Sequence, residues 1–259
     1  MTLNKINKKI FKNYSQGKIG AIIQARMGSE RLPGKSLAEV GGKPIVKHII
    51  ENLKASQYLS LIVLATTKRD EDKALVKLAE NLGVFGFTGS ENDVLARYKD
   101  AAEDFELDII VRITGDNILT DVDGMDQTIA LYLEEKPDMA VNGGKQGYPL
   151  GTAVEVLSTN LLQKLNKTAK SAIEREHVTL HIYRHQNKYR ISYLKAPDVY
   201  KDLDVRLTID TPEDLLLIRQ LYKNLKKRNE DFKLPLVTEY LKNHQEFKKI
   251  NFHIKQRIL

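Results

Sequence analysis

The sequence predicts an α/β fold in which one doubly wound domain is built around a mostly parallel sheet. Short apolar runs rich in β-branched residues, typical of buried strands, alternate with segments whose apolar residues recur at helical spacing. The connections are short and marked by Gly and Pro, as expected where strands alternate with crossover helices. No internal repeat or low-complexity linker divides the 259 residues.

The elements of the first half each have a local signal. The apolar residues of IVKHIIENL recur at helical spacing behind Pro44, which suits a first helical turn. Gly83 follows another helical stretch and is a typical helix stop. Buried strands are expected at 19–23 and 59–65, and further strands at 84–87 and 108–113. Helices are expected at 44–56, 70–82, 92–105 and 123–135.

The second half is less regular. Thr211 suits a helix cap, with Pro212 at the first helical position and Asp214 in the first turn as a capping and dipole residue. Strands are expected at 139–142, 152–157, 189–194 and 205–209. Helices are expected at 159–167 and 173–185, after Thr211, and within 234–259. The alternation of strand and helix breaks between residues 140 and 200.

Composition limits the class of protein. There is no cysteine, which rules out disulfides and thiolate sites and fits a reducing compartment, so cytoplasm is the default expectation. No apolar run has the length of a transmembrane segment, and the N-terminus has no apolar signal segment.

The net charge of +7 is concentrated at the two ends. Residues 1–18 carry five lysines and no acid, and residues 223–257 carry ten Lys or Arg against four Asp or Glu, which leaves a mildly acidic body. We expect a basic N-terminal extension (1–18), one domain (19–222) and a basic helical C-terminal tail (223–259). Solvated tails explain this pattern better than nucleic-acid binding, although a polyanion or membrane-surface role is the alternative.

The stretch 19–35, IGAIIQARMGSERLPGK, combines a buried strand with a cation-bearing loop. Glycines allow close backbone approach to a ligand, and Arg26, Arg31 and Lys35 supply positive charge. Such a loop suits a polyphosphate at the carboxyl end of a strand. It does not have the spacing of a Walker A loop, and its composition alone is also compatible with an ordinary surface turn.

Two carboxylates follow predicted strands in the same way. Asp116 comes just after 108–113 and Asp210 just after 205–209, so both fall at the sheet edge where α/β proteins bind ligands. Mg²⁺ prefers oxygen ligands, often one or two carboxylates together with phosphate oxygens. The alternatives are a turn-forming Asp after Gly115 and a residue that precedes a helix cap.

The string QARMGSERLPGK resembles the signature loop of the cytidylyltransferases that make CMP-activated acidic sugars. The likeness is to the spore-coat-polysaccharide branch, which is related to the CMP-ketodeoxyoctulosonate and CMP-acylneuraminate synthetases. It continues through GSENDVLARY, VRITGDNIL, EREHVT and LTIDTPEDL, from about residue 19 to 221. The resemblance implies a Rossmann-like nucleotidyltransferase fold, transfer of CMP from CTP to an acidic sugar with release of pyrophosphate, a Mg²⁺ cofactor and a homodimer.

The resemblance also implies roles for particular residues. Phosphate contacts and catalysis fall to Arg26 and Lys35, and metal binding and catalysis to Asp116 and Asp210. Arg31 could contact phosphate or brace the loop. The full set expected at the nucleotide is Gln24, Ala25, Arg26, Gly28, Ser29, Arg31, Lys35, Thr66, Ser90 and Asp116. Asp93 and Arg97, four apart on one helix, are expected to form a simple ion pair.

The resemblance implies that the segment near 140–200 forms the acceptor side of the site. It also implies that this segment makes a dimer contact. The implied acceptor residues are Tyr148, Glu155, His177 and Arg206. His177 could act as a base or belong to a buried polar network.

This chain departs from its branch near Tyr148: Leu150 and Ala153 stand where relatives have aspartates, and Asn117-Ile118 replaces the usual pair after Asp116. Two acceptors for sugar hydroxyls are therefore lost, which predicts a shifted or less polar acceptor. The alternatives are a sugar- or polyol-phosphate acceptor, or a non-catalytic nucleotide-binding partner in polysaccharide assembly.

Overall fold

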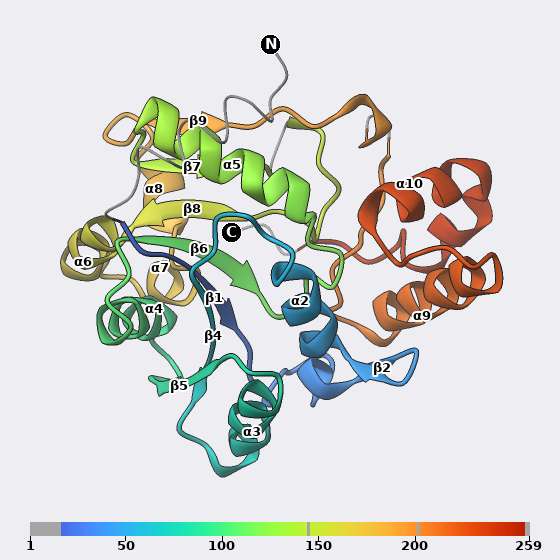
Figure 1. Ribbon diagram of the computed structural model, residues 1–259, viewed down its shortest axis with the longest axis horizontal. Helices are drawn as coiled ribbons and strands as arrows, with labels where there is room; N and C mark the ends of the chain where they lie inside the picture. Colours follow the sequence, from blue (N-terminus) through green and yellow to red (C-terminus); the bar gives the residue numbers. More distant parts are fainter. Residues whose placement is uncertain (1–16, 144–145, 201–202, 257–259) are drawn as a thin grey trace.

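The structure, a computed structural model, describes residues 17–143, 146–200 and 203–256 (Figure 1). At its centre lies a seven-stranded sheet in the order β5-β4-β1-β6-β8-β7-β9. The strands are β1 (Ile19–Gln24), β4 (Leu61–Thr67), β5 (Phe85–Gly89), β6 (Ile109–Thr114), β7 (Met139–Val141), β8 (Glu155–Ser158) and β9 (Ile191–Tyr193). All pairings are parallel except those of β8 with its neighbours β6 and β7. The predicted mostly parallel α/β sheet is confirmed.

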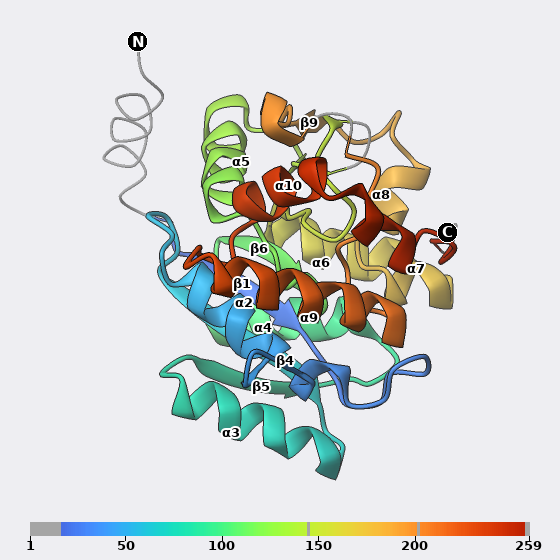
Figure 2. The same cartoon turned by 90° about the vertical axis from the view of Figure 1, so that its right-hand side faces the viewer.

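Helices cover both faces of this sheet (Figure 2). One face carries α2 (Ile45–Leu53), α3 (Lys73–Asn81), α5 (Val122–Glu135), α9 (Pro212–Lys227) and α10 (Leu234–Asn243). The other carries α4 (Val94–Asp104), α6 (Thr159–Thr168), α7 (Ala172–Glu176) and α8 (Leu180–Arg184). Alternate residues of β1 enter the two cores: Ile23 faces the first and Ile22 the second. Burial on both faces explains the continuous apolar runs of the strands.

Short elements complete the fold. A separate antiparallel pair joins β2 (Glu39–Val40) to β3 (Lys43–Pro44). The described residues also form short 3₁₀ helices: η1 (Lys35–Leu37), η2 (Asp70–Asp72), η4 (Asp198–Tyr200) and η5 (Gln245–Ile250).

The predicted strand at 205–209 is wrong. This segment makes one isolated bridge, between Arg206 and Leu150, and joins no sheet. Its amides are instead satisfied one at a time: Leu207 N donates to Leu150 O at 2.8 Å, and Ile209 N donates to Asp116 O at 3.2 Å. An apolar β-branched segment is buried both as a strand within a sheet and as an extended loop across the end of a sheet. The sequence pattern is therefore the same in the two cases. Asp210 is therefore delivered by an extended loop.

The predicted helix at 173–185 is interrupted. It splits into α7 and α8 at Val178, whose φ of 51° lies in the left-handed region that β-branched residues rarely adopt. The Val178 side chain is fully buried in the second core, which compensates for this conformation. The interruption turns Glu176 and His177 toward the cavity described below, and Thr179 toward Glu155.

Helix caps follow the local sequence. Thr211 caps α9 and forms a reciprocal capping box with Asp214, with Pro212 at the first position, as predicted. The cap of α4 is Asp93, whose carboxylate accepts from Ala96 N at 2.9 Å. Ser90 in turn accepts from the Asp93 amide at 3.1 Å.

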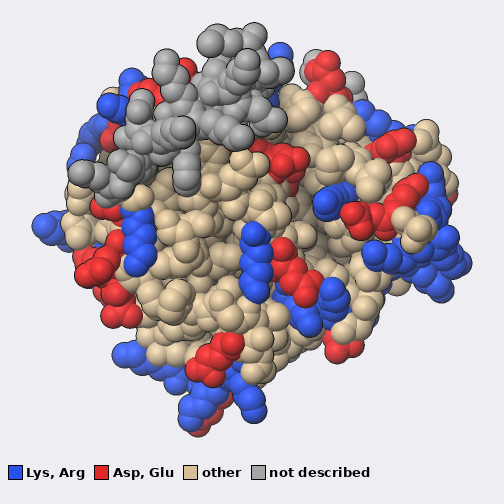
Figure 3. Space-filling model, viewed as in Figure 1, with Lys and Arg blue, Asp and Glu red and all other residues tan. Residues whose placement is uncertain are grey.

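The predicted basic N-terminal extension lies outside the described residues, apart from residues 17 and 18. In the C-terminal stretch, Leu234, Val237 and Leu241 of α10 are buried in the first core. Lys and Arg side chains gather at the right-hand edge of the molecule, over α9 and α10 (Figure 3). Among the described residues, no helix combines the length and the apolar character needed to span a bilayer.

Gly151 allows a close backbone approach that positions the 205–210 segment. Its φ is +93°, and a Cβ there would lie 2.1 Å from the backbone nitrogen of Thr208. We expect Gly151→Ala to lower the free energy of unfolding by about 2–4 kcal/mol, because backbone strain and a clash with backbone combine. The control is Gly42→Ala, where φ is +77° but no atom lies within 4 Å of the added Cβ, and where strain alone costs about 1 kcal/mol. The free energies of unfolding are measured in urea. Equal decreases for Gly151→Ala and Gly42→Ala would show that the close backbone approach at Gly151 does not contribute to stability.

Candidate active site

A cavity of about 920 Å³ opens at the carboxyl ends of β1 and β6. Its walls come from the loop after β1, the end of β6, the start of α4, the segment 150–155, α7 and the segment 208–210. This is the edge where parallel α/β sheets bind ligands, and the volume is large enough for a nucleotide.

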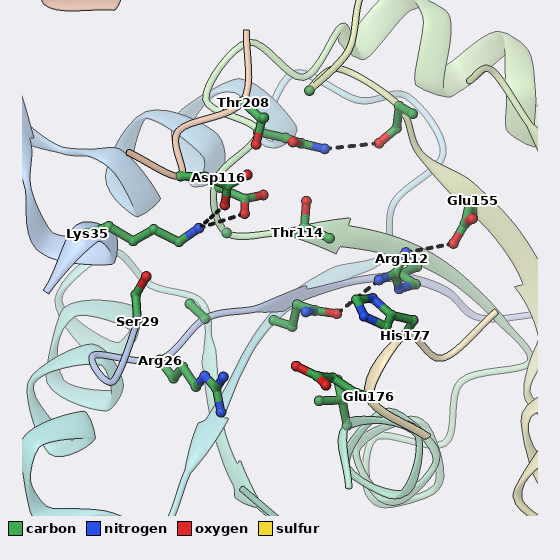
Figure 4. Close-up of a pocket in the computed structure, with 18 of the residues that line it drawn as sticks. Arg26, Ser29, Lys35, Arg112, Thr114, Asp116, Glu155, Glu176, His177 and Thr208 are labelled. Atoms are coloured by element: carbon green, nitrogen blue, oxygen red, sulfur yellow. Dashed lines mark hydrogen bonds and ion pairs between the residues drawn. The ribbon is translucent and has the colours of Figure 1, made fainter. Parts of the chain in front are cut away.

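Lys35 joins three distant segments at one side of the cavity (Figure 4). Its Nζ donates to Asp116 Oδ2 at 2.8 Å, to Asp210 Oδ1 at 2.8 Å and to Ile209 O at 3.0 Å. Arg31 Nη2 lies 3.2 Å from the other oxygen of Asp210. Two carboxylates about ninety residues apart in the sequence thus meet at the cation of the β1 loop, as the sequence predicted for their positions.

These charges shift one another. Burial alone would lower the pKa of Lys35, but the attraction and hydrogen bonds of Asp116 and Asp210 outweigh it, and the pKa is raised. Burial would raise the pKa of Asp210, but Lys35, Arg31 and Arg206 outweigh it, and the pKa is lowered. Both groups are therefore charged at neutral pH.

The lowered pKa of Asp210 predicts that the free energy of unfolding depends on pH in the acid range. The pKa of Asp210 in the folded protein is below its ordinary value of 3.8. The charged carboxylate therefore stabilises the fold fully above pH 3.8, and this stabilisation is lost as the pH falls through the lower folded pKa. We expect the wild-type protein to lose more stability than Asp210→Asn when the pH is lowered from 5 to 3. Thermal unfolding across this range tests it, and parallel curves for the two proteins would contradict it.

The donor set suits a divalent cation. Two carboxylates and one backbone carbonyl already surround the positive Nζ of Lys35, and such hard oxygen ligands are those that Mg²⁺ prefers. Asp116 and Asp210 are thus the residues that could hold a metal ion here.

Arg206 holds Asp210 in place and does not line the cavity. It is only 6% exposed, and it donates through Nη2 to Asp210 and through Nε to Asp214. Its Nη1 donates to Gln256, and Asn251 donates to the Arg206 carbonyl. The sequence placed Arg206 at the acceptor, whereas its guanidinium is taken up by this buried network.

Most of the predicted phosphate loop lines the cavity. Gln24, Ala25, Arg26, Ser29 and Arg31 all do so, with Lys35. The Arg26 guanidinium forms no hydrogen bond or ion pair within the described residues, so it is free to meet an anionic ligand. Gly28 does not line the cavity: it faces the side chains of Arg69 and Glu71.

The opposite wall is built around Glu155, near the β8 side of the sheet (Figure 4). Its carboxylate accepts from Arg112 Nη1, Thr179 Oγ1 and Tyr183 Oη, each at 2.8 Å. Arg112 also donates to Gln24 at 3.3 Å. A carboxylate that accepts from three donors is held rigidly in place.

His177, at the end of α7, faces the same end of the cavity beside Glu176 (Figure 4). Burial lowers the pKa of His177 below its ordinary value, so the imidazole is neutral at pH 7.

Besides Gly28 and Arg206, three more predicted residues do not line this cavity. Thr66 is fully buried in β4, and its hydroxyl has no partner within the described residues. Ser90 caps the turn before α4. Tyr148 is 6% exposed and packs against Tyr200, with ring centroids 5.3 Å apart.

Two arginines of the cavity wall, the buried Arg97 and the partly buried Arg112, were not among the predicted site residues. The predicted Asp93–Arg97 ion pair is wrong, because Asp93 binds Arg175 instead, with Nε 2.7 Å from Oδ2. Arg97 lines the cavity and is 2% exposed. Arg112 could have been found, because a charged residue inside the apolar run of a buried strand requires a partner or a ligand.

Comparisons with known proteins show the family of this chain. A family model described as cytidylyltransferase matches residues 20–243. An uncharacterized protein of Methanocaldococcus jannaschii is 39% identical over 240 residues, which are 93% of this chain and 97% of that protein. The spore coat polysaccharide biosynthesis protein SpsF of Bacillus subtilis is 34% identical over 226 residues, 84% of this chain and 91% of that one.

Solved structures share the fold. A cytidylyltransferase from Leptospira borgpetersenii has a TM-score of 0.82 and 30% identity, over 94% of this chain and 100% of that one. A CMP:2-keto-3-deoxy-manno-octonic acid synthetase, solved with CTP, has a TM-score of 0.60 and 19% identity, over 80% of this chain and 99% of that one. With a family match over most of its length and a site that joins a cationic loop to two carboxylates, this chain belongs to the cytidylyltransferase family.

Proposed function

We propose that this protein transfers CMP from CTP to an acidic sugar and releases pyrophosphate, in the synthesis of a surface polysaccharide or another glycan. The observation that carries the proposal is the meeting of Asp116 and Asp210 at Lys35 in the main cavity. Membership of the cytidylyltransferase family and the CTP held by a structural neighbour support the choice of nucleotide.

In the reaction, an acceptor hydroxyl oxygen attacks the α-phosphorus of CTP. A new P–O bond to the sugar forms, the bond from the α-phosphorus to the bridging oxygen of pyrophosphate breaks, and the hydroxyl proton is released. Negative charge grows on the leaving phosphates, so catalysis depends on fixed cations around them. Lys35, Arg26 and Arg31 line the cavity, which supports assigning that role to them.

A Mg²⁺ ion would be held by Asp116 and Asp210, whose oxygens already surround a cation. When bound, the ion supplies Lewis-acid stabilisation of charge on the phosphate oxygens. A more distant neighbour of the same fold was solved with manganese, which supports a divalent cation in this group.

Metal removal gives a direct prediction. We expect EDTA to abolish pyrophosphate release from CTP and added Mg²⁺ to restore it, because the oxygen donors at Lys35 suit a hard divalent cation. Pyrophosphate is measured with a coupled enzyme that is itself checked for turnover at the same EDTA concentration. Undiminished release after exhaustive chelation would exclude the metal.

The acceptor end favours a sugar that is less polar at one position than the usual substrates of this branch. Leu150 and Ala153 line the cavity where carboxylates would bind hydroxyls, and Glu155 already has three donors. The same observation favours a second candidate acceptor, a sugar- or polyol-phosphate.

One assay distinguishes these candidates. Pyrophosphate release is measured with CTP, ATP, GTP and UTP, each against a panel of acidic sugars and of sugar and polyol phosphates. We expect turnover with CTP and an acidic sugar. Better turnover with a phosphorylated acceptor selects the second candidate. CTP binding without turnover on any acceptor overturns the enzymatic proposal in favour of a nucleotide-binding partner in polysaccharide assembly.

The proposal includes a cytoplasmic homodimer. The absence of cysteine and the resemblance to the acidic-sugar synthetases support it. Light scattering of the purified protein tests the dimer, and a mass of one chain, 29.5 kDa, would overturn it.

A further inference from the structure

Arg97 is a buried cation without an anionic partner. It lies on α4, is 2% exposed and lines the cavity. Its one hydrogen bond within the described residues is from Nη1 to the carbonyl of Ser90, at 3.0 Å. Its Nε is buried and has no acceptor there. The carboxylate four residues earlier, Asp93, is used by Arg175 and by the helix cap.

Such an arrangement is costly unless a ligand completes it. Burial, more than any other cause, lowers the pKa of Arg97, and the nearby positive Arg26 lowers it further, yet guanidinium groups stay protonated in proteins. A buried charge needs hydrogen-bond acceptors, and an unmet buried donor is unfavourable. The free side of the guanidinium is a planar fork of N–H donors that matches two adjacent acceptors.

The fold holds this fork rigidly. Tyr98, the next residue, donates its hydroxyl to the carbonyls of Ile22 and Ile113, which anchors α4 to β1 and β6. Gly89 leaves room for the side chain, because a Cβ there would lie 2.9 Å from Arg97 Cγ. A fixed fork favours recognition of a specific pattern of acceptors over loose attraction of charge.

The position of Arg97 in the fold indicates which part of a nucleotide it meets. Lys35 and Asp116 follow β1 and β6, whereas Arg97 comes from the helix after β5. In the sheet order β5-β4-β1-β6-β8, the phosphate site therefore lies between Arg97 on one side and Glu155 on the other. With the acceptor at Glu155, the side of α4 is left for the base.

We propose that Arg97 reads the cytosine base, donating through Nε and Nη2 to its adjacent acceptors O2 and N3. This inference rests on the proposed use of CTP and deepens it, because it names the residue that selects the base. Uracil carries a hydrogen on N3, so a donor would face a donor, and the Arg97 fork would discriminate against UTP.

The first test changes Arg97 and compares nucleotides. Arg97→Lys keeps the charge but removes the planar fork, and Arg97→Met removes both. We expect the preference for CTP over UTP, as kcat/KM and as dissociation constants, to fall about 10- to 100-fold in both variants. The control is Arg69→Met, which removes an exposed arginine that does not line the cavity, and which should keep the preference. Equal losses for CTP and UTP would overturn the inference and assign Arg97 to the phosphates.

The second test needs no substitution and so does not depend on the folding of a variant. The wild-type protein is titrated with CTP and with 3-deazacytidine triphosphate, in which a C–H replaces N3. We expect the analogue to bind about 10-fold or more weakly. Equal affinity overturns the inference while leaving the proposed function intact. Failure of wild-type protein to bind or use CTP at all overturns the proposed function itself.

Discussion

Asp116→Asn and Asp210→Asn are each expected to lower kcat with CTP by about 10³-fold or more. Both carboxylates lie 2.8 Å from Lys35 Nζ, at the point in the cavity where the transferred phosphates and their metal ion would meet. The amide keeps the size of each side chain but removes the negative charge that a divalent cation needs. Weak CTP binding should persist, because Arg26 and Arg31 remain in the cavity wall.

Steady-state pyrophosphate release measures the loss, and titration with CTP measures the binding that remains. Asp70→Asn is the matched control, because that carboxylate is 92% exposed and, within the part of the chain that the structure describes, pairs with the surface residue Lys73 alone. Its turnover should equal that of the wild type. If either Asp116→Asn or Asp210→Asn retains turnover, that aspartate is not a metal ligand.

The two substitutions should differ in stability. Among the charged groups of the described residues, Asp116 bonds only to Lys35, whereas Asp210 also accepts from Arg31 and the buried Arg206. Loss of charge at Asp210 leaves Arg206 with a weaker partner in a place that excludes water. We therefore expect Asp210→Asn to be the less stable of the two at pH 7.

The sequence was sufficient for the parts of the fold that depend on local pattern. Continuous apolar runs identified β1, β4 and β6, because strands buried on both faces need no polar alternation. Thr211, Pro212 and Asp214 identified the start of α9, because a capping box satisfies its amides from within the same four residues.

Features that depend on tertiary context were not predictable in the same way. Residues 205–209 have the composition of a strand, yet their backbone partners are Leu150 and Asp116, and nothing local specifies that pairing. Val178 interrupts a helical pattern because its side chain is buried in the core, at a cost in backbone energy that only the packed structure compensates.

The site residues likewise divide into those that local sequence predicted and those that depend on tertiary contacts. Arg26, Lys35 and Asp116 line the cavity after β1 and β6, where the sequence pattern put them. Asp210 also lines the cavity, although the strand predicted before it does not form. Arg97 was assigned to the nearest acid at helical spacing, a rule that holds for exposed pairs. In the structure Arg175, from a segment eighty-two residues away, takes that acid and leaves Arg97 facing the cavity. The competition between two arginines for one carboxylate is a property of the fold.

Asp214→Ala is expected to cost about 3–5 kcal/mol of unfolding free energy, the largest stability effect we predict. Asp214 is fully buried, and its two oxygens accept from Arg206 Nε, Asn251 Nδ2 and the amides of Asp210 and Thr211, at 2.8–3.2 Å. Its removal leaves Nε of the buried Arg206, the side-chain amide of Asn251 and two backbone amides without this acceptor, and opens the capping box of α9.

Urea unfolding of wild type, Asp214→Ala and Asp214→Asn measures this network. Asp214→Asn keeps one acceptor oxygen, so its free energy of unfolding should fall less than that of Asp214→Ala. Glu213→Ala removes a charge from the same helical turn but no partner of Arg206 or Asn251. Its free energy of unfolding should fall far less than that of either Asp214 variant. Because Asp214 and Arg206 together hold Asp210, the folded fraction of Asp214→Ala should also show a reduced kcat with CTP. If its stability matches that of Glu213→Ala and its kcat that of wild type, the buried network neither stabilises the fold nor positions the carboxylate on which the proposed chemistry depends.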